Sequence, residues 1–301
     1  MRRRDVAVWM LVAATTASAQ APAAQNPSPM VERSRRHERL HPSALDSAAL
    51  VVAWSDGTSM TLRVPPGRAR DGLIDVVVHF HGAAWLPVQA IARAHPRAVA
   101  VVINAGAGSG VYDRTFADPA RFDTLLAAVA REVQAAHGRP VTLGRITLSG
   151  FSAGHGAIRA ILRTPRHAER IDAVLLLDGM HASYVPERRV LADSGMIDTT
   201  ALTSLAAFAR RAVRGERRML VTHSEIFPGT FASTTETADW LLATLDLARR
   251  PVLRWGPRGM QQTSEVRAGR LLVQGFSGNS APDHIDHLHA MPELLARLLG
   301  R

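Results

Sequence analysis

The sequence predicts an α/β fold in which a mostly parallel β-sheet is flanked by helices. Short apolar runs that are typical of buried strands alternate with amphipathic stretches that are typical of helices. Hydrophobic residues make up 47% of the 301 residues, which is enough for a sizeable core. A turn at residues 150–154 joins an apolar strand directly to a run of small residues with helical character.

The composition argues against several functional classes. The formal net charge is +10, and the basic residues are all arginines that are scattered along the chain. A nucleic-acid-binding protein usually gathers its positive charge on one face, so no nucleic-acid partner is expected. The chain has no cysteine, which excludes disulfides, a thiol nucleophile and a lipid-modified cysteine. No oligomeric state follows from these features.

The N-terminus has the parts of a secretory signal peptide. Arginines at positions 2–4 precede a short apolar run at residues 6–14, and Ala17-Ser18-Ala19 is a typical cleavage site. The apolar run is short for a membrane span, and an uncleaved anchor is the alternative. We expect a signal peptide at residues 1–19 that is cleaved after Ala19, a secreted or periplasmic location, and no stable membrane insertion after cleavage. Residues 20–45 are rich in Ala, Pro and Gln and predict a flexible tether to a domain at residues 46–301.

The predicted strands and helices follow in alternation. Two segments, Leu50–Trp54 and Met60–Val64, flank an Asp-Gly turn and predict a hairpin. Apolar runs at residues 74–80, 98–104, 146–148, 173–177, 218–222 and 271–276 predict further strands. Helices are predicted from Asp118 with Pro119 in first position, after Ala153, over residues 200–214, from the capping box Ser233–Glu236 to about Ala248, and from Pro292.

The remaining segments read as loops. The glycine-rich residues 105–110 lack a helix directly behind them, so they fit a dinucleotide-binding loop poorly. Residues 182–198 show no clear period and could cover part of the site. A polar loop or hairpin is predicted at residues 251–269, and the loop behind the last strand is expected to extend through residues 283–289.

The turn Gly150-Phe151-Ser152-Ala153-Gly154 fits the G-x-S-x-G pattern of a nucleophilic serine. A serine between a strand and a helix sits on a strained backbone with close neighbours on both sides, so only small residues fit beside it. The strain exposes the Ser152 hydroxyl, and the amide of Ala153 points to the same place. A plain tight turn is the alternative, which the flanking strand and helix disfavour.

These features together resemble the α/β-hydrolase fold: the hairpin, the strand that ends in His81-Gly82, the serine turn, and the histidines behind the last strand. The resemblance covers about Leu50 to the C-terminus, with the chain order serine, acid, histidine. The chain looks most like secreted bacterial hydrolases whose substrates are poorly assigned. The resemblance therefore implies a serine hydrolase without naming a substrate.

A serine nucleophile needs a base, because a free hydroxyl barely ionises at neutral pH. His284 and His287 both follow the last strand, and His284 is favoured because it lies nearer the end of that strand. The three histidines and two aspartates at residues 283–289 also resemble a metal cluster. Without cysteine or a fourth distant ligand, this alternative is the weaker one.

The histidine needs an acid that fixes its tautomer and stabilises its charged form. Asp178 ends the strand after the serine's strand, and Glu225 follows the next strand; the fold accepts an acid from either. Asp178 is favoured because aspartate is the commoner acid and four apolar residues precede it. The alternatives are a turn-forming role for Asp178 before Gly179, and for Glu225 a structural pairing with His223.

Further residues complete the predicted site. The oxyanion of a tetrahedral intermediate needs two backbone donors, for which Ala83 and Ala153 are the candidates. His79 and His81 are expected to be hydrogen-bonded structural residues, with a zinc pair as the alternative. Aromatic residues just past strand ends are candidates for pocket walls, and each is individually better explained as core: Trp85, Tyr112, Phe116 and Tyr184.

We therefore expect a secreted serine hydrolase that cleaves small carboxylic esters through an acyl-enzyme on Ser152, without a cofactor or a metal. The first alternative is a protein of the same fold that binds a ligand without catalysis. A metal-dependent hydrolase is the second and less favoured alternative. Peptides and lactones are further candidate substrates, because this fold hosts several chemistries.

Overall fold

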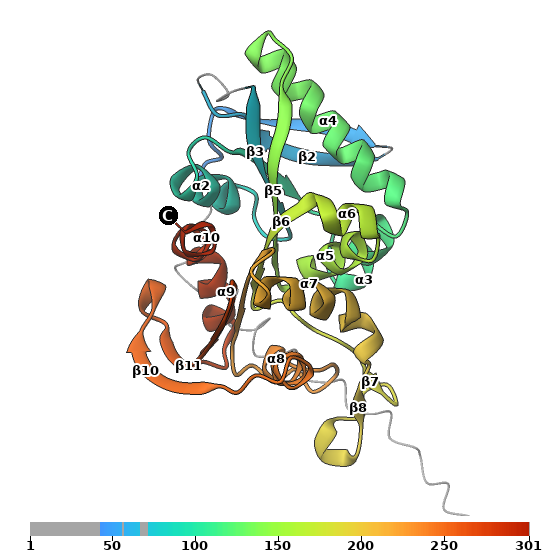
Figure 1. The fold of residues 1–301 in the computed structure, drawn as a ribbon, viewed down its shortest axis with the longest axis vertical. Coiled ribbons are helices and arrows are strands. Elements are labelled where there is room, and N and C mark those ends of the chain that lie inside the picture. Colours follow the sequence, from blue (N-terminus) through green and yellow to red (C-terminus); the bar gives the residue numbers. More distant parts are fainter. Residues whose placement is uncertain (1–42, 56, 67–71, 301) are drawn as a thin grey trace, which may run out of the picture.

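The computed structural model describes residues 43–55, 57–66 and 72–300, so the predicted signal peptide and most of the predicted tether lie outside the described residues. The chain forms a ten-stranded sheet with helices on both faces (Figure 1). The strand order is β1-β2-β4-β3-β5-β6-β9-β12-β11-β10. The central strands, in the order β4-β3-β5-β6-β9-β12, run parallel to one another. The pairs outside them, toward both edges of the sheet, are antiparallel. The predicted α/β class with a mostly parallel sheet is confirmed.

The elements alternate along the chain as follows. The strands of the large sheet are β1 Ala49–Ser55, β2 Thr58–Arg63, β3 Leu73–Phe80, β4 Val99–Ile103, β5 Thr142–Phe151, β6 Ile171–Leu177, β9 Arg218–His223, β10 Arg250–Trp255, β11 Gln261–Ala268 and β12 Leu271–Phe276. A separate ribbon pairs β7 Tyr184–Val185 with β8 Met196–Ile197. The helices are α2 Trp85–Ala94, α3 Ser109–Thr115, α4 Pro119–His137, α5 His155–Leu162, α6 Pro165–Arg170, α7 Thr203–Val213, α8 Thr234–Thr244, α9 Ala281–His289 and α10 Met291–Leu299.

Each face of the sheet has its own hydrophobic core. Successive side chains of a strand point to opposite faces, so Val76 and Val78 enter one core and Val77 enters the other. Helices α4, α5 and α7 cover the first core, and α2 and α10 cover the second (Figure 1). The central strands are therefore buried on both faces, which explains their continuous apolar sequences.

The predicted starts of α4 and α8 are confirmed, whereas α8 ends at Thr244 and not at about Ala248. The Asp118 side chain accepts a hydrogen bond from the amide of Ala120 at 2.9 Å and caps α4, which ends at Gly138 with φ of 64°. The capping box predicted for α8 is present, with the Ser233 and Glu236 side chains each bonded to the other's backbone. Residues 251–269 form the predicted hairpin, as strands β10 and β11.

Two segments predicted as loops are helices. Helix α3 starts at Ser109, directly behind the glycine-rich residues, and its seven residues are too few to show a clear period. Residues 283–289 lie within α9, so the predicted loop there is wrong. The Ser280–Asp283 capping box and Pro282 in the first turn start this helix, and clustered polar residues hid its buried face.

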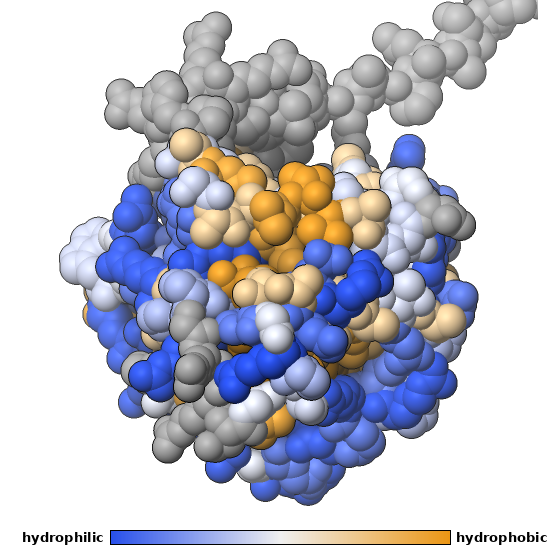
Figure 2. Space-filling model, turned by 90° about the horizontal axis from the view of Figure 1, so that it is seen from above, coloured by the Kyte–Doolittle hydropathy of each residue, from blue (hydrophilic) through white to orange (hydrophobic). Residues whose placement is uncertain are grey.

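The exposed hydrophobic residues include several on the two edge strands. Leu50 and Val51 on β1 are 58% and 70% exposed, and Leu253 and Trp255 on β10 are 77% and 75% exposed. From above, most of the surface is hydrophilic, and hydrophobic residues gather in one part of that face (Figure 2). None of the helices in the described part of the chain is both long enough and apolar enough to cross a membrane.

Candidate active site

Ser152 lies at the turn between β5 and α5, with a backbone φ of 47°. This left-handed conformation is unfavourable for a residue with a side chain, and such strain concentrates at functional sites. The turn depends on its glycines, because a Cβ added at Gly154 would lie 2.1 Å from the backbone oxygen of Phe80. Strand β3 therefore passes so close to the turn that a larger residue at position 154 would collide with it.

Asp178 lies beside Ser152, at the carboxyl ends of the central parallel strands. It follows β6, which pairs in parallel with the serine's strand β5. The following residue, Gly179, packs so closely on the serine that an added Cβ would lie 2.7 Å from both the N and O atoms of Ser152. Asp178 is 1% exposed and has a φ of 41°, so it is a second strained residue at this end of the strands.

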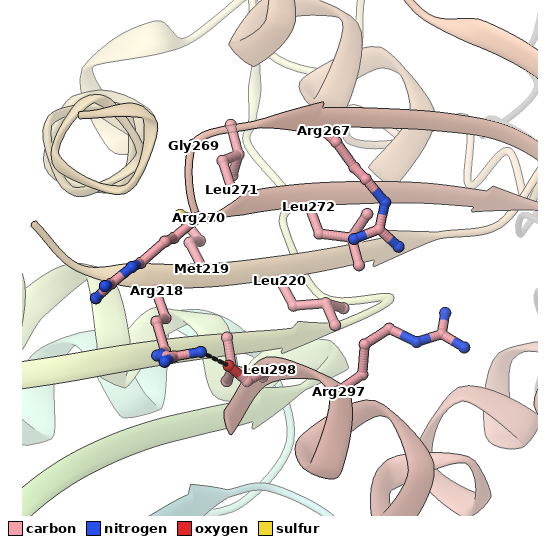
Figure 3. Close-up of a pocket in the computed structure, with 10 residues that line it drawn as sticks. All are labelled: Arg218, Met219, Leu220, Arg267, Gly269, Arg270, Leu271, Leu272, Arg297 and Leu298. Carbon is pink, nitrogen blue, oxygen red and sulfur yellow. Dashed lines mark hydrogen bonds between the residues drawn. The ribbon is translucent and has the colours of Figure 1, made fainter. Parts of the chain in front are cut away.

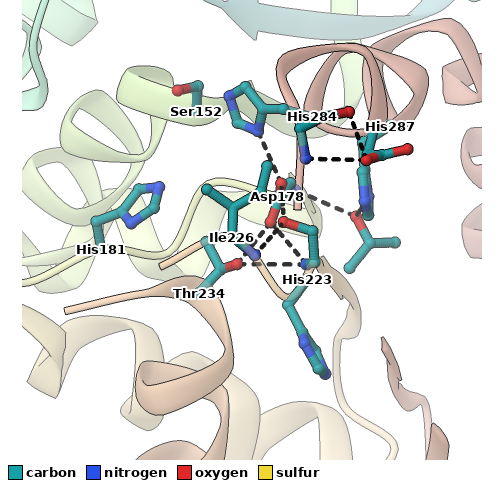
Figure 4. A network of polar contacts seen from close by, with 12 residues as sticks. Ser152, Asp178, His181, His223, Ile226, Thr234, His284 and His287 are labelled. Atoms are coloured by element: carbon teal, nitrogen blue, oxygen red, sulfur yellow. Dashed lines mark hydrogen bonds and ion pairs between the residues drawn. The ribbon is translucent and has the colours of Figure 1, made fainter. Parts of the chain in front are cut away.

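The Asp178 carboxylate holds the ring of His284. The Nδ1 atom of His284 donates a hydrogen bond to Asp178 Oδ2 at 2.7 Å (Figure 4). Since Nδ1 carries the proton, Nε2 of the neutral ring has the free lone pair. The ring packs on Phe151, the residue before Ser152, with 4.5 Å between ring centroids.

Three further donors fix the Asp178 carboxylate. It accepts hydrogen bonds from the Ser224 amide at 2.9 Å, the Ser224 hydroxyl at 2.7 Å and the Thr234 hydroxyl at 2.6 Å. Burial alone would raise the pKa of Asp178. The neighbouring rings of His287 and His284 and these hydrogen bonds outweigh burial, so the pKa lies well below its usual value and the carboxylate is ionised.

The hydroxyl of Ser152 and the ring of His284 lie on the same side of Asp178 (Figure 4). Within the described part of the chain, no hydrogen bond joins the two side chains. Without a bound substrate, hydrogen bonds between a nucleophile and its base are often long or poorly aligned. The structure thus places Ser152 and His284 on one side of Asp178, with the aspartate–histidine bond formed and the Ser152 hydroxyl turned away from the ring (Figure 4).

The alternative base and acid have other surroundings. His287 lies one turn along α9 from His284, and its Nδ1 atom lies 2.8 Å from the hydroxyl of Thr222. Burial lowers its pKa to about 4. Glu225 is exposed, and its amide bonds to the Gly278 oxygen. His223 bonds to Thr235 and Arg249 instead of Glu225.

A cavity of about 570 Å³ opens onto Ser152. The residues that line it come from five segments: His81; Ala107, Gly108, Ser109 and Gly110; Ser152, Ala153, His155 and Arg159; His181, Ala182 and Ser183; and Phe231. Ala153, one of the two expected oxyanion donors, therefore borders the cavity beside the serine. Ala83, the other, is not part of the lining, to which its neighbour His81 contributes instead.

Two cavity histidines, His155 and His181, went unnoticed in the sequence. Their signal was position, since one follows the serine turn directly and the other lies three residues after Asp178. Nδ1 of His155 lies 2.9 Å from the backbone oxygen of Ser152. Burial lowers the pKa of both rings, that of His155 to about 3, so both are neutral near pH 7.

Most of the other singled-out residues are buried, and His81 also lines the cavity. His79 is fully buried between the Ser149 hydroxyl at 3.0 Å and the His81 oxygen at 2.7 Å, and His81 Nδ1 lies 2.9 Å from the Tyr112 hydroxyl. These bonds agree with the expected structural role. Of the four candidate aromatics, Tyr112, Phe116 and Tyr184 are buried, and none of the four lines the cavity, whereas Phe231 does.

No metal centre is formed by the acidic residues and histidines of the described chain, where no group of three or more such side chains is placed to hold an ion. The suspected cluster at residues 283–289 lies on a helix, and its members bond elsewhere. His284 binds Asp178, and His287 binds Thr222.

A second cavity, of about 200 Å³, lies at the opposite ends of the strands, where β9 and β12 begin (Figure 3). Its polar residues are arginines, and its remaining walls are mainly leucines: Arg218, Arg267, Arg270, Arg297, Leu220, Leu271, Leu272 and Leu298, with Met219 and Gly269. The ten residues of this lining include no serine, histidine or carboxylate. Of these two cavities, the first alone is lined by side chains that can perform nucleophilic catalysis.

Comparison with known proteins shows which solved structures share this fold. No family model matches the chain, and no curated protein matches its sequence. The enterobactin esterase of Shigella flexneri, solved in the presence of enterobactin, has 15% identity and a TM-score of 0.54 over 86% of this chain and 61% of that chain. An enterochelin esterase from Shigella flexneri has 14% identity and a TM-score of 0.52 over 85% of this chain and 59% of that chain.

A third similar structure is the ferric enterobactin esterase of Salmonella typhimurium, with 15% identity and a TM-score of 0.50 over 85% of this chain and 61% of that chain. The chain thus spans about three fifths of the length of these esterases. At such low identity the likeness concerns the fold. Together with the strand order and the serine turn, it shows that the chain has the α/β-hydrolase fold.

Proposed function

We propose that this protein is a serine hydrolase that cleaves carboxylic esters, with Ser152 as nucleophile, His284 as base and Asp178 as the acid that orients the base. The observation that carries the proposal is the 2.7 Å bond from His284 Nδ1 to a buried, ionised Asp178 beside the strained Ser152. A serine, a histidine and an aspartate gathered at the carboxyl ends of the strands serve nucleophilic catalysis and have no evident structural purpose.

The reaction proceeds in two halves. The Ser152 oxygen attacks the carbonyl carbon of the ester, and its proton passes to Nε2 of His284. The charged imidazole is stabilised by Asp178, and it returns the proton to the leaving alcohol as the C–O bond breaks. A water molecule then attacks the acyl-enzyme and gives one proton to His284. His284 passes this proton to the Ser152 oxygen as the acyl C–O bond breaks, which releases the carboxylic acid and restores the serine hydroxyl.

Backbone amides stabilise the oxyanion of both tetrahedral intermediates. Ala153 is the first proposed donor, because it borders the cavity directly after Ser152. Ala83, after the strand end at His81-Gly82, is the second. The left-handed φ values of 74° at His81 and 116° at Gly82 turn the chain sharply just before the exposed residue Ala83, which supports this role for its amide.

The substrate is proposed to be a small ester, because the cavity of about 570 Å³ has the size of a small-molecule site. The similar solved structures are esterases by name, which favours an ester bond, open or in a lactone ring, over a peptide bond. This reaction needs no cofactor. The expectation of an exported protein stays a proposal as well, with the mature chain beginning at Gln20.

A fluorophosphonate probe tests the proposal, because it reacts covalently with activated serines. We expect one probe per wild-type molecule, attached to the peptide that contains Ser152, and none on Ser152→Ala. Hydrolysis of p-nitrophenyl esters should disappear in the same variant and survive chelators. Folded wild-type protein that neither reacts with the probe nor hydrolyses any ester would identify a ligand-binding protein. Chelator-sensitive activity that persists in Ser152→Ala would identify a metal-dependent enzyme.

A further inference from the structure

His181 presents one ring nitrogen for recognition in the cavity beside Ser152. Its Nδ1 atom lies 3.1 Å from the backbone oxygen of Ala232. A carbonyl oxygen only accepts hydrogen bonds, so Nδ1 carries the proton and donates it. In the neutral ring, Nε2 then has a free lone pair and acts as an acceptor. The tautomer of a residue in the cavity wall is thereby fixed by the backbone.

The backbone that fixes His181 is itself rigidly tied. The Ala232 amide donates a hydrogen bond to the Ala182 oxygen at 2.8 Å, so the segment after Asp178 is joined to the segment before α8. The ring also packs edge-on against Phe231, with 5.0 Å between centroids. The direction of the Nε2 lone pair is thus set before any substrate binds.

The ring of His181 is neutral near pH 7. Burial lowers the pKa of His181, although the carboxylate of Asp178 opposes this effect. A second cavity ring, His155, packs edge-on against His181 with 5.7 Å between centroids, and its Nδ1 atom lies 2.9 Å from the Ser152 oxygen. The neutral His181 ring therefore offers an acceptor at Nε2 rather than a donor.

Much of the rest of the cavity wall is apolar. Phe231 and Ala182 are apolar, and Gly108 and Gly110 have no side chain. Besides Ser152 and His155, the wall has the hydroxyls of Ser109 and Ser183 and the ring of His81, whose Nδ1 atom lies 2.9 Å from the Tyr112 hydroxyl. The one cation, Arg159, is already paired through its Nε atom with a carboxylate oxygen of Asp113 at 2.5 Å. In an apolar pocket, a few fixed polar groups determine which ligand is selected and how it is oriented.

We propose that Nε2 of His181 accepts a hydrogen bond from a hydroxyl group of the substrate, so that the protein selects esters with one hydroxylated arm over esters with plain hydrocarbon arms. This inference rests on the proposed function, because it takes the cavity to be the ester site. It assigns His181 to substrate recognition, while the chemistry stays with Ser152 and His284.

Binding to the Ser152→Ala protein tests the inference without depending on hydrolysis. The ligands are methyl phenylacetates and benzyl acetates, each unsubstituted or with an ortho, meta or para hydroxyl, and the methoxy analogue of each phenol. Titration calorimetry should give a Kd for the best phenol about three- to tenfold below that of its unsubstituted parent, as expected for one neutral hydrogen bond. The methoxy analogue should bind no better than the parent, because it cannot donate.

The matched variants are His181→Phe, which keeps a ring of similar size, and His181→Leu, each in the Ser152→Ala background. The preference for the phenol should vanish in both and persist in the control His137→Phe, which makes the same change at a histidine outside the cavity lining. Melting curves identify any variant that does not fold, in which case the other one decides. A preference that survives in both His181 variants, equal binding of phenol and parent, or no binding of any ester would overturn the inference.

Hydrolysis of the same esters by the wild-type protein separates the two proposals. A hydroxyl preference in binding that depends on His181, without any hydrolysis, would contradict the proposed function and support the inference. Hydrolysis that depends on Ser152 and ignores the hydroxyl would do the reverse.

Discussion

Asp178 and His284 are 106 positions apart in the chain, yet His284 Nδ1 lies 2.7 Å from Asp178 Oδ2. This bond fixes the proton on Nδ1 and leaves Nε2 free on the side of Ser152. The helix α9 and the strand β6 together produce it, since one carries the histidine and the other ends at the aspartate. The relationship leads to several tests.

The first prediction concerns the acid. In Asp178→Asn the fold should persist, because Asn keeps one acceptor for the Ser224 and Thr234 donors, but the imidazole of His284 should adopt the wrong tautomer. We expect kcat for an ester substrate to fall by up to about 10⁴-fold with KM little changed. Glu225→Gln, at an exposed position, is the matched control and should cost less than about tenfold. The opposite ranking of the two variants would move the role to Glu225.

The second prediction concerns the base. His284→Ala should lose nearly as much activity as Ser152→Ala, because either change removes the same proton transfer. His287→Ala should lose about tenfold or less, since its ring bonds to Thr222. Urea unfolding, followed alongside kcat/KM, corrects for any destabilisation by the loss of this buried ring. Equal losses of activity in two stable variants would contradict the assignment.

The third prediction concerns pH and stability. Burial lowers the pKa of His79 to about 3, so this ring binds its proton only after unfolding. The free energy of unfolding should therefore fall as pH drops below about 6.5, the pKa of an unfolded histidine. For one such residue, the free energy of unfolding should be about 2 kcal/mol lower at about pH 5 than at about pH 7.

His79→Gln removes this term, so its loss of stability over the same pH range should be smaller by that amount. His223→Gln gives an independent second value, because burial and the neighbouring Arg249 lower the pKa of His223 to about 3 as well. Denaturant titrations at the two pH values provide the measurement. Parallel pH profiles for wild type and both variants would show that these rings are not neutral in the folded protein.

The fourth prediction concerns the serine turn. Gly154→Ala should destabilise the protein, because its methyl group would meet the backbone oxygen of Phe80 at 2.1 Å. Overpacking of this kind costs about 1–3 kcal/mol, which corresponds to a fall in Tm of about 2–12 °C. Gly110→Ala is the control, since the nearest neighbour of an added Cβ is the guanidinium of the exposed Arg114 at 3.2 Å. An unchanged Tm for Gly154→Ala would mean that β3 and the turn are further apart than described.

The fifth prediction concerns export. The chain expressed with its own N-terminus in a bacterial host should be recovered from the periplasm or medium, beginning at Gln20, because Ala17-Ser18-Ala19 fits signal peptidase. Intact-mass spectrometry reads the new terminus directly, and Ala19→Pro is the control that should block cleavage. A membrane-bound protein that still begins at Met1 would favour the uncleaved anchor.

The sequence alone determined the features that depend on neighbouring residues. Glycines at positions 150 and 154 allow the sharp turn that presents Ser152. The capping residues Asp118 and Ser233 set the starts of their helices through contacts with residues two or three positions further on. The alternation of apolar strands with amphipathic helices likewise specified a parallel sheet. Such signals are local because backbone sterics and the first hydrogen bonds of a helix involve only nearby residues.

Local signals failed where polar residues masked a short helix. Helix α9 looked like a loop because its histidines and aspartates obscured the apolar period, and α3 was too short to show one. Both helices carry residues of the site or its cavity, so the errors fell where function departs from simple hydrophobic patterning.

Only the tertiary structure decided the partners of each side chain. Position along the chain ranked His284 above His287, but the packing of α9 on the sheet determines which ring meets Asp178 and which meets Thr222. His155, His181 and Phe231 become walls of one cavity because strand order brings the ends of β5, β6 and β9 together. A hydrogen bond or a cavity between distant segments depends on the strand order and the packing of the whole sheet, and no short stretch of sequence contains that information.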